Sequence, residues 1–202
     1  MGISVRDFEQ MKARLGGTPR AATPALPSRR LSSLASGEII LGVDPSLRGT
    51  GYGVIRAVKS QFKVVVHGTI ACPAGWERSR CLVKIIQTLR DVLREHKPTV
   101  CVVEGLFFAQ NLKTAIIMGE ARGAAMAVIA EVGLDIFEIA PRKVKQAIVG
   151  HGGAQKLAVA KMVQRMLGLA ELPEPDAADA LALAIAHAHE AGRYRLTAPK
   201  RI

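Results

Sequence analysis

The chain has 202 residues, is 49% hydrophobic and carries a formal net charge of +11, so it is long enough for one domain with a sizeable core plus a short extension. A positive charge of this size favours a polyanionic partner, most often nucleic acid. No apolar stretch approaches the ~20 residues of a membrane-spanning helix, and the three cysteines follow no secretory signal, so we expect reduced thiols and a cytoplasmic protein.

Residues 1–37 differ in composition from the rest of the chain. They are rich in Gly, Pro, Ala, Ser and Arg and lack sustained apolar periodicity, which predicts a flexible basic N-terminal extension. They hold six basic and two acidic residues, a net charge of +4, so the remainder of the chain carries the other +7. An organelle-targeting peptide is the alternative interpretation, since such peptides are rich in Arg and Ser, but Asp7 and Glu9 count against it.

Three β-type runs follow, at residues 39–43, 51–55 and 62–70. Their short separations predict an antiparallel meander. From residue 78 to residue 95 the period changes, because leucines and isoleucines recur at helical spacing. Residues 99–103 form a continuous apolar run, as expected for a central strand that is buried on both faces.

Predicted helices and strands also follow one another in the second half of the chain. We expect a helix over residues 111–131, a strand over 135–138, and a helix that begins at Pro141. Glycines between residues 150 and 153 then break the chain. Helices over 154–167 and 176–190 complete an α/β fold, in which helices flank a five-stranded mixed sheet.

Four carboxylates lie at the ends of predicted strands or at the start of a predicted helix. Asp44 and Glu104 each end a predicted strand, and Asp176 and Asp179 share one face at the start of the last helix. Each residue alone has an ordinary explanation: Asp44 can form a turn, Glu104 can terminate a strand, and Asp176 can cap a helix. Strand ends in an α/β sheet can nevertheless bring distant residues together.

A cluster of four carboxylates needs a cation, because the like charges raise one another's pKa. Their charge would balance two divalent ions, and hard oxygen ligands suit Mg²⁺ or Mn²⁺. The start of a helix also favours ionised Asp176 and Asp179 through the helix dipole. Alanine at nearly every second position of this helix would let its backbone approach the sheet closely; the alternative is a close-packed helix with no function.

An ordered set of motifs resembles the RuvC family of bacterial Holliday-junction resolvases. Leu41-Gly42-Val43-Asp44-Pro45 with Gly51-Tyr52-Gly53 is similar to the first family motif, and Val103-Glu104 with Phe107 to the second. Gly119-Glu120-Ala121-Arg122-Gly123 and Val144-Lys145-Gln146 match the middle, and Asp176-Ala177-Ala178-Asp179 the last motif. Ser46-Leu47 stand where the family usually has glycine. The resemblance covers about residues 38–190.

The resemblance implies a ribonuclease-H-like fold and a magnesium-dependent endonuclease of DNA recombination and repair. Asp44, Glu104, Asp176 and Asp179 would bind two Mg²⁺ ions, or Mn²⁺ in their place, and paired symmetric nicks in a four-way junction would leave 5′-phosphate and 3′-hydroxyl ends. It also implies cooperation with a RuvA–RuvB branch-migration complex. The alternatives are a non-catalytic junction-binding scaffold of the same fold and an actin-like or sugar-kinase fold, which normally needs a second domain.

Basic residues around the glycine break are candidate DNA ligands. Arg142, Lys143, Lys145 and Lys156 lie there, and the resemblance implies DNA contacts for Lys145 and Lys156. Phe107 matches a family position that stacks on bases at the junction. A solvated basic face and ordinary core packing are the respective alternatives.

A two-fold junction that is cut twice calls for two active sites, so we expect a homodimer. Ala115, Gly119 and Gly123 recur at four-residue spacing in the second predicted helix, which makes this helix the predicted interface. The alternative is that these small residues pack on the protein's own sheet. The predicted organisation is therefore an extension over 1–37, a nuclease domain over 38–190 and a basic C-terminal tail over 191–202.

Overall fold

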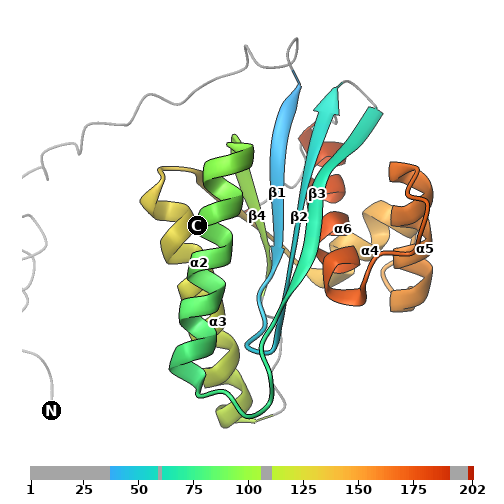
Figure 1. Cartoon of the computed structure of the whole chain (residues 1–202). Coiled ribbons are helices and arrows are strands. Elements are labelled where there is room, and N and C mark those ends of the chain that lie inside the picture. Colours follow the sequence, from blue (N-terminus) through green and yellow to red (C-terminus); the bar gives the residue numbers. More distant parts are fainter. Residues whose placement is uncertain (1–36, 59–60, 106–110, 192–199) are drawn as a thin grey trace, which may run out of the picture. The chain divides into compact units, whose positions relative to one another are not determined.

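The computed structural model describes residues 37–58, 61–105, 111–191 and 200–202. A mixed sheet of six strands in the order β3-β2-β1-β4-β5-β6 forms its centre (Figure 1). The strands are β1 (Glu38–Asp44), β2 (Gly49–Val58), β3 (Gln61–Ala71), β4 (Val100–Glu104), β5 (Asp135–Ile139) and β6 (Lys200–Arg201). The first three form the predicted antiparallel meander, while β1, β4 and β5 are parallel.

The sixth strand corrects the prediction of five. β6 has only two residues and pairs with the edge of β5, which is too short a segment to carry a β pattern. It lies within residues 191–202, which we predicted to be a basic tail. The extension over 1–37 falls outside the described residues except for Gly37, and its role stays a prediction.

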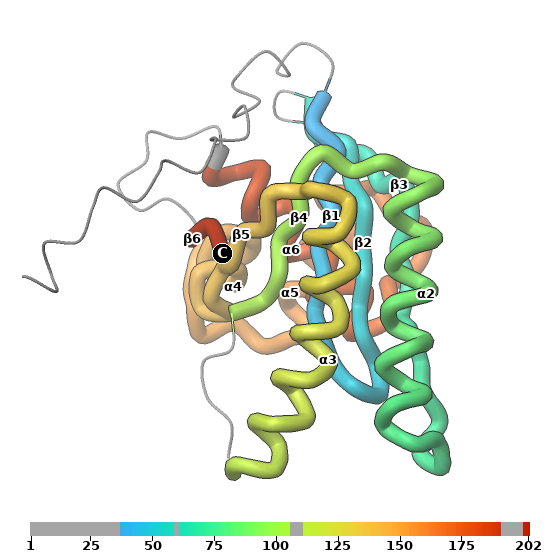
Figure 2. The backbone as a smooth tube through the Cα atoms, turned by 90° about the vertical axis from the view of Figure 1, so that its left-hand side faces the viewer, coloured from blue at the N-terminus to red at the C-terminus, as the bar shows by residue number. Residues whose placement is uncertain are grey.

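Helices cover both faces of the sheet, which confirms the predicted α/β class. α2 (Arg78–His96) and α3 (Leu112–Glu131) lie on one face, and α4 (Pro141–Val149), α5 (Lys156–Leu167) and α6 (Pro175–Ala191) on the other (Figures 1 and 2). Pro141 opens α4 and Gly150, in a left-handed conformation, ends it, as the sequence indicated. No helix in the described part of the chain could span a bilayer.

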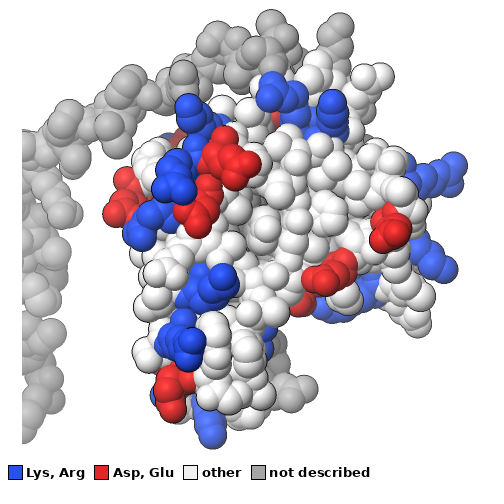
Figure 3. All heavy atoms as spheres, in the orientation of Figure 1, with Lys and Arg blue, Asp and Glu red and all other residues white. Residues whose placement is uncertain are grey.

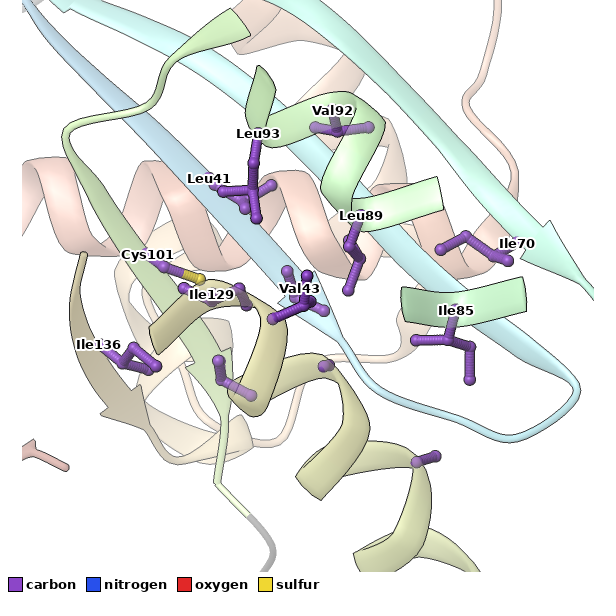
Figure 4. Packing of buried hydrophobic residues seen from close by; sticks show 14 of the residues in the cluster. Leu41, Val43, Ile70, Ile85, Leu89, Val92, Leu93, Cys101, Ile129 and Ile136 are labelled. Carbon is purple, nitrogen blue, oxygen red and sulfur yellow. The ribbon is translucent and has the colours of Figure 1, made fainter. Parts of the chain in front are cut away.

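Two separate hydrophobic cores hold the layers together. On the α2–α3 side, Ile85 and Leu89 are fully buried and point toward Val43 of β1 (Figure 4). Residues of β4 alternate between the cores: Cys101 and Val103 face this one, while Val100 and Val102 face α4–α6. β4 is therefore buried on both faces, as its unbroken apolar run predicts. All three cysteines are free and buried.

The helix α6 lies unusually close to the sheet. A Cβ atom on Gly42 of β1 would collide with the backbone oxygen of Ala180, and one on Gly51 of β2 with that of Asp176. The alanines of α6 are buried against these strands. Small residues on both partners thus allow the close approach, which confirms the prediction made from the alanines of the helix.

Candidate active site

Asp44 and Glu104 lie side by side at the carboxyl ends of two neighbouring strands. β1 and β4 are parallel with Val43 opposite Val103, so the residues that follow share the same edge of the sheet. The two carboxyl groups share a hydrogen bond. The topology therefore joins two acids that are 60 residues apart in the sequence, as predicted from their positions at strand ends.

The start of α6 brings the two remaining carboxylates to this edge. Asp44 pairs with Gly51 across the β1–β2 ladder, and Gly51 lies directly against the backbone of Asp176. The Asp176 carboxylate reaches the start of β2, where its Oδ2 lies 2.5 Å from the Cβ position of Gly49. Asp179 is close enough to Asp44 and Glu104 to raise the pKa of both. The four predicted carboxylates form one cluster.

Lys156 supplies the cation within the cluster. Its Nζ lies 2.7 Å from Oδ2 of Asp179, and the Lys156 side chain remains 71% exposed while that of Asp179 is 19% exposed. The sequence placed Lys156 only among residues that contact DNA. The first residue of α5 instead lies beside the acids because α5 packs against α6, an arrangement that sequence spacing does not indicate.

Burial and mutual repulsion disfavour the ionised carboxylates. The pKa of Glu104 rises from 4.5 to about 8, first through burial and then through the charge of Asp44 and the hydrogen bond with it. Burial followed by the charge of Asp179 raises the pKa of Asp44 from 3.8 to about 6. Without a further cation, the pair retains a proton near neutral pH.

Asp176 contradicts the expectation drawn from the helix dipole. Burial raises the pKa of its carboxyl group, and the neighbouring Lys156 offsets this only in part. Burial is the largest cause of this rise, and the charge of Asp179 adds to it. In contrast, hydrogen bonding to Asp179 raises the pKa of Lys156 and secures its positive charge.

The cluster contains carboxylates of the kind that bind a hard divalent cation, but their present arrangement is not that of a metal site. Within the described ranges, no group of three or more acidic, imidazole or thiol side chains is arranged to hold a metal ion. Glu104 and Asp44 are hydrogen-bonded to each other, and Asp179 is paired with Lys156. The excess of buried negative charge still fits a divalent cation, which would replace the shared proton and release Asp179.

The turn after Asp44 does not need the glycine that Ser46 and Leu47 replace. The Thr50 hydroxyl donates to the Ser46 carbonyl at 2.5 Å and accepts from the Ser46 amide at 3.2 Å. Leu47 is buried in the core. Among the described non-glycine residues only Lys97 has a positive φ, so this turn forms without strain. Arg48 anchors it to the carbonyls of Pro73 and Trp76.

The basic residues predicted to bind DNA lie on the same side of the sheet as α6. Arg142 and Lys143 are exposed on α4, and Lys145 is half-buried there. Basic and acidic groups lie close together on the α2–α3 side (Figure 3), where Arg90 and Glu131 form an exposed ion pair at 2.9 Å. Phe107 lies outside the described residues.

The small-residue face of α3 is open. Gly119 and Gly123 are exposed, and a Cβ atom on either would meet no atom within 4 Å. Ala115 is half-buried on the same helix. The alternative that both glycines pack on the protein's own sheet is therefore wrong.

Comparisons with known proteins agree with this geometry. The family profile described as Crossover junction endodeoxyribonuclease RuvC matches residues 40–187. Proteins of that name from Syntrophomonas wolfei and Rubrobacter xylanophilus are 44% and 43% identical, over 78% and 75% of this chain and 91% and 85% of theirs. The solved structure of Thermus thermophilus RuvC with a Holliday junction substrate is 32% identical, with a TM-score of 0.74 over 82% of this chain and 99% of that one.

Proposed function

The chain belongs to the RuvC family of crossover junction endodeoxyribonucleases, and we propose that Asp44, Glu104, Asp176 and Asp179 form the centre at which it cuts four-way DNA junctions. The observation that carries this proposal is the cluster itself. Four acids from β1, β4 and α6 converge although their ionised forms repel one another. A fold that needed only stability would replace them with apolar residues.

The donor set favours Mg²⁺, with Mn²⁺ as a substitute, and its charge matches two ions. Two such ions would activate a water molecule and stabilise the leaving 3′ oxygen, which gives 5′-phosphate and 3′-hydroxyl products. Asp44 and Glu104 would release their shared proton to solvent on binding metal. The Lys156 ammonium, no longer paired with Asp179, would then be free to contact a phosphate of the bound strand.

We assign DNA binding to basic residues of α4 and α5. Arg142, Lys143 and Lys145 of α4 and Lys156 of α5 would contact the phosphates. Phe107 follows Glu104 by three positions, which supports stacking of its ring on an unpaired base near the cut. These contacts hold the junction, while the carboxylates perform the hydrolysis.

Two chains pair through α3 in this proposal. Leu112 and Ile116 are 76% and 51% exposed on this helix, next to the open surface of Gly119 and Gly123. A two-fold axis through paired α3 helices would place one active site on each of two opposed strands. Paired symmetric nicks follow from that symmetry.

Family membership supports a proposal for the cellular setting. We place the protein in the bacterial cytoplasm with the chromosomal DNA, acting on junctions that a RuvA–RuvB complex moves along the duplex. The basic extension over 1–37 would add non-specific affinity for DNA.

Incubation of the purified protein with a labelled four-way junction tests the proposal. We expect paired nicks in opposed strands in Mg²⁺, none with a chelator, and no ATP hydrolysis. A matched linear duplex controls for general nuclease activity. A protein that binds the junction tightly but never cuts it in Mg²⁺ or Mn²⁺ would be the non-catalytic scaffold instead.

A further inference from the structure

A buried arginine lies directly behind the active-site end of β4. Arg122 projects from the inner face of α3 and is only 9% exposed. One guanidinium nitrogen donates to the backbone carbonyl of Glu104 at 2.5 Å, and another donates to Oε2 of Glu138 at 2.5 Å. We propose that Arg122 is a positioning residue that holds Glu104 at the catalytic cluster without touching the substrate. The inference rests on the proposed catalytic role of Glu104.

The contacts around Arg122 constrain one short piece of backbone. The amide of Gly105 donates to the carbonyl of Ile139 at 2.9 Å, which keeps the end of β4 paired with β5. The side chain of Glu138 packs against Gly105 at this end: a Cβ atom on Gly105 would lie 3.2 Å from the Cγ atom of Glu138. Arg122 bridges the Glu138 carboxylate and the Glu104 carbonyl. The backbone on both sides of the Glu104–Gly105 bond is thus fixed.

The charge and shape of the arginine both matter in this position. A buried guanidinium needs charged or strong hydrogen-bonding partners, and Glu138 supplies the opposite charge. The rigid planar fork can donate to a carboxylate and a carbonyl at the same time. Lysine would keep the charge but lose the fixed geometry. Because a small displacement of a catalytic group strongly slows a reaction, the anchor on Glu104 bears directly on metal binding and cleavage.

The position of Arg122 on α3 separates this role from that of the neighbouring glycines. Gly119 and Gly123 face outward into open space, whereas Arg122 faces inward to β4 and β5. One helix therefore carries both the open surface and the anchor of a catalytic residue. Loss of the anchor should affect the metal site while the open surface stays intact.

Replacement of Arg122 by glutamine tests the inference, with Arg90→Gln as the matched control. Arg90 also pairs with a carboxylate, Glu131, but both side chains are exposed, at 51% and 60%. The affinity for Mn²⁺ is measured by the loss of the free-ion paramagnetic resonance signal. Junction affinity and single-turnover cleavage are measured on the same preparations, and circular dichroism reports folding.

We expect Arg122→Gln to weaken Mn²⁺ binding about tenfold or more, as is typical when a partner behind a metal ligand is lost. Cleavage at low Mn²⁺ should fall at least as far and recover in part at saturating Mn²⁺, while junction affinity stays within about threefold. Arg122→Lys should give an intermediate Mn²⁺ affinity. Arg90→Gln should match the wild type in all three measurements.

A folded Arg122→Gln protein with wild-type Mn²⁺ affinity and cleavage would overturn the inference. If that variant does not fold, Glu138→Gln replaces it, because it keeps the side-chain shape and an acceptor oxygen. It should weaken Mn²⁺ binding in the same direction, and unchanged binding would again overturn the inference. Glu104→Gln in parallel separates the two proposals: if it binds Mn²⁺ and cuts normally, the catalytic role of Glu104 is what fails.

Discussion

Glu104→Gln should make the metal-free protein more stable in alkaline solution. In the folded state the pKa of Glu104 is about 8 rather than 4.5. The folded protein therefore holds this proton more tightly than the unfolded chain does. The proton on Glu104 therefore stabilises the folded state. This contribution is complete below pH 4.5 and is lost as the pH rises through about 8. Glutamine removes this loss because it cannot ionise.

The size of the effect follows from the same values. Each pKa unit corresponds to about 1.4 kcal/mol, so a rise from 4.5 to about 8 sets a ceiling near 5 kcal/mol. Glu104 keeps partial contact with solvent, and screening reduces the expected gain to about 2 kcal/mol. The variant and the wild type should differ by this amount at pH 9 and converge toward pH 5.

Urea unfolding between pH 5 and pH 9 in the presence of a chelator measures this difference. Glu131→Gln is the control, since its carboxylate is 60% exposed and paired with Arg90. Mg²⁺ at pH 8 should stabilise the wild type more than the variant, because only the wild type retains all four ligands. Parallel stability profiles for the wild type and Glu104→Gln would refute the buried, repulsive cluster.

Three further changes probe other parts of the account. Lys145→Ala should weaken junction affinity and reduce the slope of log K against log salt by about one unit; an unchanged slope in filter-binding titrations would exclude a phosphate contact. Gly119→Leu should give a folded monomer in sedimentation velocity that nicks without coordination, whereas a stable dimer would place the interface elsewhere. Gly51→Ala should lower the free energy of unfolding by about 3 kcal/mol, because its Cβ atom would strike the backbone of Asp176. Gly75→Ala is the control, since a Cβ atom there meets nothing within 4 Å. Equal losses of stability in urea unfolding would contradict the close packing of α6.

Much of the fold could be predicted from local pattern. The apolar run that became β4 and the leucine spacing of α2 depend only on which faces are buried. The strand-end positions of Asp44 and Glu104 were also informative, since neighbouring parallel strands end at one edge. The alanines of α6 predicted its close approach to the sheet. The glycines at 42 and 51 of β1 and β2, which make room for the α6 backbone, indicate the same packing.

The remainder depends on tertiary contacts that have no local signature. Lys156 enters the carboxylate cluster through the packing of α5 on α6. Arg122 meets Glu138 only because α3 covers the end of β4 and β5. The raised pKa of Asp176 arises from burial, which its place at a helix start did not reveal. β6 takes its strand conformation from the edge of β5 rather than from its own sequence.

The most direct test of the central claim compares cutting with binding in Asp44→Asn. Asp44 lies within the carboxylate cluster, whereas Glu174 is an exposed acid just before Asp176 and serves as the control in Glu174→Gln. Single-turnover cleavage of a four-way junction in Mg²⁺ should be abolished in Asp44→Asn, while its junction affinity stays within about tenfold because phosphate contacts lie on basic residues. Glu174→Gln should cut at the wild-type rate. A normal cleavage rate for Asp44→Asn would contradict the assignment of the catalytic centre to these four carboxylates.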